Sequence, residues 1–179
     1  MDSTLLSARS LQTMVHGIML SGGSLVGLAI ALFSLVVMRS ASDLPSVSRQ
    51  SRSLAGVLVV TAVALWLAVL VGTYVVFPPY RATPPSGSQA LAAYPRAMLL
   101  ANPDTAWLHS FAMECKEHMP WIAAMLTTAA AFAVVRHRAT VLSDAFLRPM
   151  LIALVALSLI LVSFIGLLGI FVNKAAPLQ

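Results

Sequence analysis

Four long stretches with apolar centres limit what this chain can fold into. They lie roughly over residues 13–38, 54–77, 105–135 and 149–172. Each is long enough for the ~20 residues that cross ~30 Å of hydrocarbon. Backbone groups in lipid find no water to bond, so these stretches must be helices. The sequence therefore predicts an all-α integral membrane bundle of four antiparallel transmembrane helices. It forms one domain over 1–179, with a structured outer loop over 78–104.

The composition leaves no room for a separate soluble domain. Charged residues make up 9% of the chain and hydrophobic residues 59%, whereas soluble domains carry about 25% charged residues. The net charge of +5 is small and spread over the loops. This pattern argues against a nucleic-acid partner and favours contact with the lipid bilayer. The single cysteine, Cys115, excludes an internal disulfide and any CxxC motif.

Arginines gather in the two short loops and predict the topology. They are Arg39, Arg49 and Arg52 in the first loop, and Arg136, Arg138 and Arg148 in the third. The positive-inside rule places such loops in the cytoplasm. The Ala-, Val-, Leu- and Arg-rich composition is typical of a bacterium. We therefore expect a multi-pass protein of the inner membrane, with both termini and the outer loop in the periplasm.

Prolines and short polar residues shape the expected helix boundaries after residue 78. Pro95 is expected to interrupt a short helical piece of the outer loop. Asp104 or Thr105 is predicted to cap the third helix. Pro120 leaves two versions open: one straight helix over 104–135, or an interfacial helix followed by a span that starts at Pro120.

Histidines and carboxylates gather at the end of the helices opposite the arginines. His16 begins the first helix, while His109, Glu114, Glu117 and His118 lie at the start of the third. At 1.5 Å per residue from the arginine ends, His16 falls between His109 and His118 in depth. Glu114 and His118 are four residues apart and share a helix face. His137 sits between two arginines and is expected to be an exposed cap.

Three interpretations of this cluster remain open. In the first, His16 and either His109 or His118 are the axial ligands of a haem b. In the second, His16, Glu114 and His118 hold a metal ion. The nearby thioether and thiol groups favour copper, while carboxylate with imidazole suits zinc or iron. In the third, no cofactor is bound, and Glu114, Lys116, Glu117 and His118 pair with one another and with a partner subunit. Glu114, Glu117 and His118 then form a docking patch or a proton relay.

The layout resembles small four-helix integral membrane b-type cytochromes. The resemblance rests on His16 and Gly17 in the first helix, Leu108 and His109 in the third, and the basic caps Arg39 and Arg136. It implies a small subunit of a redox or respiratory complex. Such a subunit holds one haem b near the outer face and exchanges electrons with quinol or a periplasmic carrier. The alternatives are a non-catalytic scaffold or assembly subunit, and a copper-handling membrane protein. His137 is the one histidine near the cytoplasmic side, so a second haem is not expected.

Overall fold

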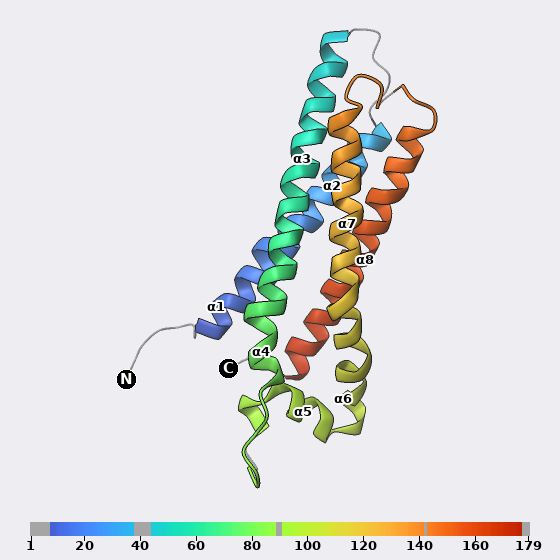
Figure 1. Cartoon of the computed structure of the whole chain (residues 1–179). Helices are drawn as coiled ribbons and strands as arrows, with labels where there is room; N and C mark the ends of the chain where they lie inside the picture. The colour runs from blue at the N-terminus through green and yellow to red at the C-terminus, as the bar shows by residue number, and fades with distance from the viewer. Residues whose placement is uncertain (1–7, 38–43, 89–90, 142, 177–179) are drawn as a thin grey trace.

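The computed structural model describes residues 8–37, 44–88, 91–141 and 143–176, and within them it contains helices and no strand. The elements, in chain order, are α1 (Ala8–Met14), the π-helical segment η1 (Val15–Gly22), α2 (Gly23–Val37), α3 (Leu44–Val71), the π-helical segment η2 (Gly72–Val76), α4 (Phe77–Arg81), the 3-10 turn η3 (Leu91–Ala93), α5 (Pro95–Ala101), α6 (Pro103–Trp107), the π-helical segment η4 (Leu108–Met113), α7 (Glu114–Arg136) and α8 (Leu147–Ala175). Figure 1 shows the long helices running side by side, with α5 and α6 closing one end.

These elements join into four apolar runs that are long enough to cross a membrane. The four spans are Ser10–Val37, Arg49–Arg81, Pro103–Arg136 and Leu147–Ala175. Large apolar side chains point outward from every span, among them Phe33, Val60, Phe132 and Ile160. Water would oppose such a surface, whereas lipid solvates it. The predicted class is therefore confirmed: the chain is a multi-pass, four-helix membrane bundle.

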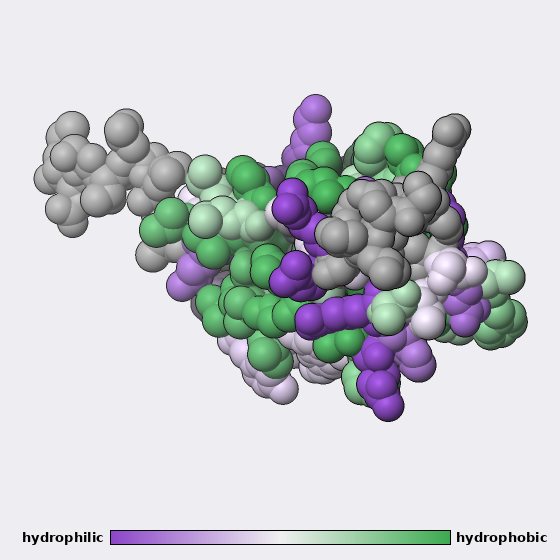
Figure 2. Space-filling view, turned by 90° about the horizontal axis from the view of Figure 1, so that it is seen from above, coloured by the Kyte–Doolittle hydropathy of each residue, from purple (hydrophilic) through white to green (hydrophobic). Residues whose placement is uncertain are grey.

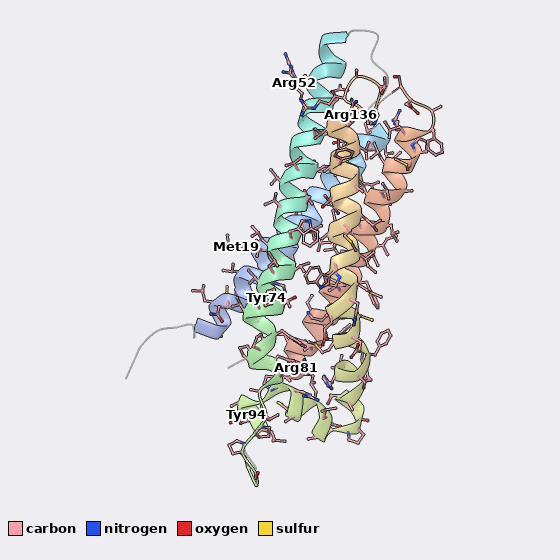
Figure 3. All side chains as sticks on the ribbon, in the orientation of Figure 1. Met19, Arg52, Tyr74, Arg81, Tyr94 and Arg136 are labelled. Carbon is pink, nitrogen blue, oxygen red and sulfur yellow. The ribbon has the colours of Figure 1, made fainter. Side chains whose placement is uncertain are left out.

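The two ends of the bundle differ in chemistry. Arg52 and Arg136 lie at one end, and Arg81 and Tyr94 lie at the other (Figure 3). We call the first the arginine end and the second, where His16 and His109 are found, the histidine end. Figure 2 looks along the bundle from the arginine end and shows hydrophilic residues gathered there, with hydrophobic residues around them.

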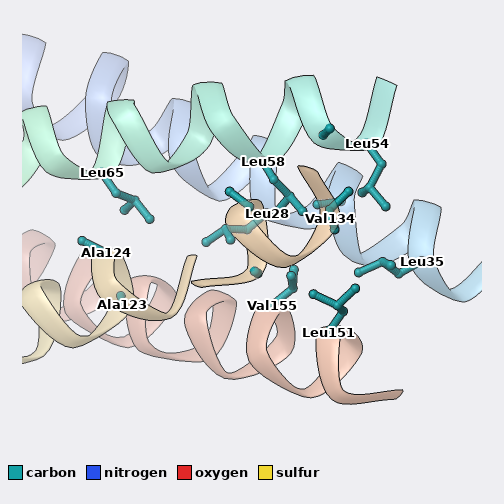
Figure 4. Close-up of a cluster of buried hydrophobic side chains, with 14 of the residues drawn as sticks. Leu28, Leu35, Leu54, Leu58, Leu65, Ala123, Ala124, Val134, Leu151 and Val155 are labelled. Atoms are coloured by element: carbon teal, nitrogen blue, oxygen red, sulfur yellow. The ribbon is translucent and has the colours of Figure 1, made fainter. Parts of the chain in front are cut away.

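The spans pack as a ring in which each helix has two neighbours. α3 packs on α2 and α7, and α8 packs on α7 and α2, so the first and third spans are diagonal. The main core extends from the arginine end of this ring past its middle, as far as Val69. Figure 4 shows part of this core. Its fully buried members include Leu28, Leu35, Leu58, Val134, Leu151 and Val155. α7 contributes mainly alanines to this core, and such small residues let the helix backbones approach one another closely.

Polar contacts fix the arginine end. Arg148 donates from Nε to the carbonyl of Leu35 at 2.9 Å and from a terminal nitrogen to that of Val36 at 3.2 Å. These are the last carbonyls of α2, which lack partners within their own helix. A cation here also stabilises the negative end of the helix dipole. Arg148 thereby joins the start of the fourth span to the end of the first. Arg39 lies outside the described residues.

Three boundary predictions need correction or completion. The third span is continuous, and Pro120 lies inside α7 rather than starting a new helix. Asn102, not Asp104 or Thr105, caps its start, because the Asn102 side chain accepts from the backbone nitrogen of Asp104 at 3.0 Å. Pro95 begins α5 instead of interrupting a helix, since a first-turn proline sacrifices no helical hydrogen bond.

Candidate functional site

Three spans change from α-helix to π-helix near the histidine end. The π-helical segments are η1, η2 and η4. The first contains His16, the second begins at Gly72, and the third contains His109. A π-helical turn holds an extra residue, which turns side chains away from their α-helical direction, and such turns are frequent at functional sites. Residue types alone did not signal these segments.

The ring of His16 packs directly on Gly72 of the neighbouring span. A Cβ atom added to Gly72 would lie 2.8 Å from the ring atom Cε1, so no larger residue fits without moving the ring. The ring is hydrogen-bonded to the backbone carbonyl of Ala68. Its other nitrogen, Nδ1, is buried and has no hydrogen-bond partner among the residues that the structure describes. One ring nitrogen of His16 is therefore hydrogen-bonded, whereas the other is a buried polar atom without a hydrogen-bond partner among the described residues.

Lys116 reaches into the bundle from the diagonal span. Its Nζ lies against Gly169 of α8, where an added Cβ would come within 2.8 Å. His16 and Lys116 are close enough to interact electrostatically. Within the described part of the chain, no carboxylate forms an ion pair with Lys116. The Lys116 side chain therefore lies in the interior near a histidine, and the described residues give it no counter-ion.

All four spans contribute to this arrangement at one depth. Counted along the last three spans, the distance from an arginine is 20 or 21 residues: Gly72 from Arg52, Lys116 from Arg136, and Gly169 from Arg148. At 1.5 Å per residue this is about 30 Å, the thickness of a hydrocarbon core. We call His16, Gly72, Lys116 and Gly169 the His16–Lys116 layer. It lies at the hydrocarbon boundary of the histidine end.

A second polar group lies further toward the same end. The Tyr80 hydroxyl and Nδ1 of His109 are 2.9 Å apart and form a hydrogen bond. Glu117 and Arg96 both interact electrostatically with this pair. The buried Nε of Arg96 has no hydrogen-bond partner. α4, α5, η4 and α7 therefore bring together what we call the Tyr80–His109 cluster.

Glu114 and His118 form a pair on the outside of the bundle. Nδ1 of His118 is 2.9 Å from the backbone carbonyl of Glu114 and 3.9 Å from its carboxylate. The side chains are 66% and 72% exposed, respectively. The shared helix face predicted for them is present, and Glu117 interacts electrostatically with both Tyr80 and His109. Of the three residues predicted as one relay or patch, Glu114 and His118 are thus paired and exposed, whereas Glu117 forms no ion pair with another described residue.

The predicted haem ligands are not placed around one point. His16 lies at the level of Ala68 and Gly72, whereas His109 bonds Tyr80, which lies eight residues beyond Gly72 on the same span. That is about two helical turns, or roughly 12 Å. His118 is mostly exposed. Two axial nitrogens must bind one iron atom from opposite sides, so this arrangement does not fit a haem held by two histidines.

The arrangement also gives no support to a three-ligand metal site. Across residues 8–37, 44–88, 91–141 and 143–176, no three His, Cys, Asp or Glu side chains gather closely enough to hold a metal ion. His16 is in the interior, while the other two predicted ligands, Glu114 and His118, are exposed. His137 is the exposed C-cap residue of α7.

The sequence predicted Lys116 as a member of the surface patch and Gly72 and Gly169 as small residues that a haem could approach, but it did not predict that Lys116 lies against Gly169 or that His16 lies against Gly72. A signal for Lys116 was present, because it shares a helix face with Ala112 four residues before it and Ala123 seven residues after it. Both alanines are fully buried. A lysine on the buried face of a span would have pointed to an interior site. Gly72 and Gly169 carried no such signal, because seven other glycines are scattered along the chain.

The comparisons with known proteins place this chain in no family: no family model, no curated protein and no solved structure matches it.

Proposed function

We propose that the protein is a small integral subunit of a membrane redox or respiratory complex. In this role it supplies a proton-exchanging polar layer rather than an electron-carrying cofactor of its own. The observation that carries the proposal is the meeting of His16 and Lys116 at one depth, from diagonal spans. Ionisable groups within spans cost energy in lipid and are kept mainly where they serve transport, proton transfer or ligand binding. In the proposed orientation the histidine end faces the periplasm.

The two polar groups at this end can pass protons between the hydrocarbon boundary and water. His16 and Lys116 lie at the boundary, and the Tyr80–His109 cluster lies beyond it toward the surface. Imidazole and phenol groups both donate and accept protons. Glu117 extends this series of groups toward α7. Quinol loses two protons and two electrons when it is oxidised. The protons would leave through these groups, and the electrons would pass to a redox centre of a partner subunit.

A scaffold subunit is the second candidate, supported by a separate feature. Glu114 and His118 project from α7 with most of their side-chain surface exposed. Trp107 and Phe111 are exposed on the preceding turns of the same span. An aromatic and charged face at the end of a span is suited to docking another membrane subunit. Copper handling, the remaining candidate, lacks a gathered ligand set in the described residues.

The decisive experiment is purification of the tagged chain from native membranes with its partners. We expect it to co-purify with subunits that carry redox centres, and the separated chain to show no Soret band. His16→Gln and Lys116→Met should lower quinol-linked activity per assembled complex, whereas His137→Gln should not. Co-purification with partners that have no redox centre would favour the scaffold role. A Soret band from the isolated chain that disappears in His16→Ala would establish haem binding instead. Copper in the isolated chain would favour metal handling.

A further inference from the structure

We propose that the His16–Lys116 layer binds a hydroxyl group of a quinol-type headgroup, between Nδ1 of His16 and Nζ of Lys116. This inference deepens the proposed function and rests on it for the choice of a quinol. The binding site itself is inferred from the hydrogen-bonding needs of two side chains. One lacks a donor and the other lacks an acceptor.

The hydrogen bond to Ala68 determines which nitrogen of His16 is free. A backbone carbonyl can only accept, so the ring nitrogen that meets Ala68 must carry a proton. Nδ1 has no partner, so the nitrogen that donates is Nε2. In a neutral ring, Nδ1 then carries a lone pair and can only accept.

Lys116 has the opposite requirement. An ammonium group has three donors and no acceptor. Nζ points inward to Gly169 rather than out toward the lipid headgroups. No carboxylate among the described residues pairs with it. Among the described residues, the layer therefore presents a buried acceptor without a donor and a donor without a counter-ion, and the two groups interact electrostatically.

A hydroxyl group satisfies both requirements with a single oxygen atom. Its hydrogen can be donated to His16, and its lone pairs can accept from Lys116. A lipid phosphate or a carboxylate would satisfy Lys116 but would bring no proton for Nδ1. Ketones and ethers have the same shortcoming. A phenolic headgroup with an apolar tail also suits the depth of the layer, at the boundary of hydrocarbon and water.

The test measures binding of a radiolabelled decyl-tailed benzoquinol, kept reduced, to the full chain in phosphatidylcholine nanodiscs. Empty nanodiscs give the background partitioning into lipid. We expect saturable binding at one quinol per chain. The dimethyl ether of the same quinol keeps the oxygens but has no hydroxyl hydrogen, and it should bind at least about tenfold more weakly, because His16 then receives no donor. This comparison uses the unaltered protein and does not depend on how any variant folds.

Matched variants locate the site. Lys116→Met and His16→Leu should each weaken quinol binding at least about tenfold. Gly169→Ala should also weaken it, because the new Cβ would displace Nζ of Lys116. Gly166→Ala is the control on the same helix, since nothing lies within 4 Å of its added Cβ.

Equal binding of quinol and ether, or full binding by Lys116→Met, would overturn the proposal. The absence of saturable quinol binding would also overturn the proposal, because water would then fill the site. Displacement of bound quinol by phosphatidylglycerol would overturn it as well.

The outcome is separable from that of the proposed function. Failure of quinol binding would leave co-purification with a redox complex unaffected. Conversely, the chain could bind quinol but not its ether and yet co-purify with no redox partner. That result would support the binding site and contradict the proposed function.

Discussion

At the scale of single residues, one tyrosine hydroxyl orients His109. Tyr80 is buried and its hydroxyl lies 2.9 Å from Nδ1 of His109. Tyr80→Phe keeps the ring and removes this bond, so we expect a loss of about 1 kcal/mol of stability. The measurement is the denaturation midpoint in detergent. Tyr74→Phe is the matched control, because Tyr74 is 70% exposed and lies on the same span. Similar losses in both variants would show that the bond to His109 contributes nothing specific.

Residue identity explains how much of the candidate site could be predicted. His16 and the Glu114–His118 pair stood out because ionisable groups are rare in this chain and helical spacing relates them. Lys116 was hidden among charged neighbours, although the buried residues on its helix face, such as Ala123, indicated an inward direction. The contacts of Gly72 and Gly169 depend on which spans are neighbours. No spacing within a single helix contains that information.

At the scale of elements, the crossing of the first two spans depends on one glycine. A Cβ on Gly27 would collide with the hydroxyl of Thr61, which is buried and donates to the carbonyl of Val57 at 2.7 Å. We expect Gly27→Ala to destabilise the bundle by about 1–3 kcal/mol, because Thr61 cannot move without losing that bond. Gly23 lies one turn earlier, and nothing lies within 4 Å of its added Cβ.

Denaturation midpoints of the two glycine variants test this crossing. Gly23→Ala should be neutral or slightly stabilising, since alanine has the better helix propensity. If Gly23→Ala proved as damaging as Gly27→Ala, close packing at Gly27 would not be the cause.

The start of α8 carries a pH-dependent cap. The Asp144 carboxylate accepts from the backbone nitrogens of Leu147 and Phe146, both at 2.8 Å. These bonds, Leu147 first, hold the pKa of Asp144 below its ordinary value of 3.8, with a smaller contribution from His137. A lowered folded pKa stabilises the fold fully above the ordinary value. That stabilisation is lost as the pH falls through the lower, folded value.

Comparison with Asp144→Asn isolates the charge of this cap. At neutral pH the variant should have a lower denaturation midpoint than the natural chain. The difference should shrink as the pH falls below 3.8 and through the folded pKa. A difference that is constant across this range would show that the charge of Asp144 plays no part.

The extent of the spans was predictable, whereas their internal irregularity was not. Length and apolar content define a span because lipid allows no unpaired backbone, and the four predicted helices are present. The second helix begins at Leu44, ten residues before its predicted start, so Arg49 and Arg52 lie in a helix and not in a loop. Its span continues past the predicted end through two prolines to Arg81, because proline fits the first turn of α4. The three π-helical segments depend on contacts between spans, which hydrophobicity does not reveal.

At the scale of the whole molecule, four spans require both ends of the chain to lie on one side of the membrane. The described chain starts at α1 and finishes after α8, and both of these ends belong to the histidine end (Figure 1). Arginines such as Arg52, Arg136 and Arg148 mark the opposite end. The positive-inside rule retains short arginine-rich loops in the cytoplasm. The histidine end should therefore face the periplasm.

Reporter fusions test this orientation directly. A phosphatase that is active only in the periplasm should be active when fused after Gln179, and inactive when inserted after Arg138 in the loop between α7 and α8. A fluorescent reporter that matures only in the cytoplasm should give the reverse pattern. Substituting Arg136, Arg138 and Arg148 by glutamine should weaken the preference and yield a mixed population, because these residues supply part of the retention signal. Cytoplasmic activity of the Gln179 fusion in the natural chain would invert the orientation. It would also place the His16–Lys116 layer at the cytoplasmic boundary of the membrane.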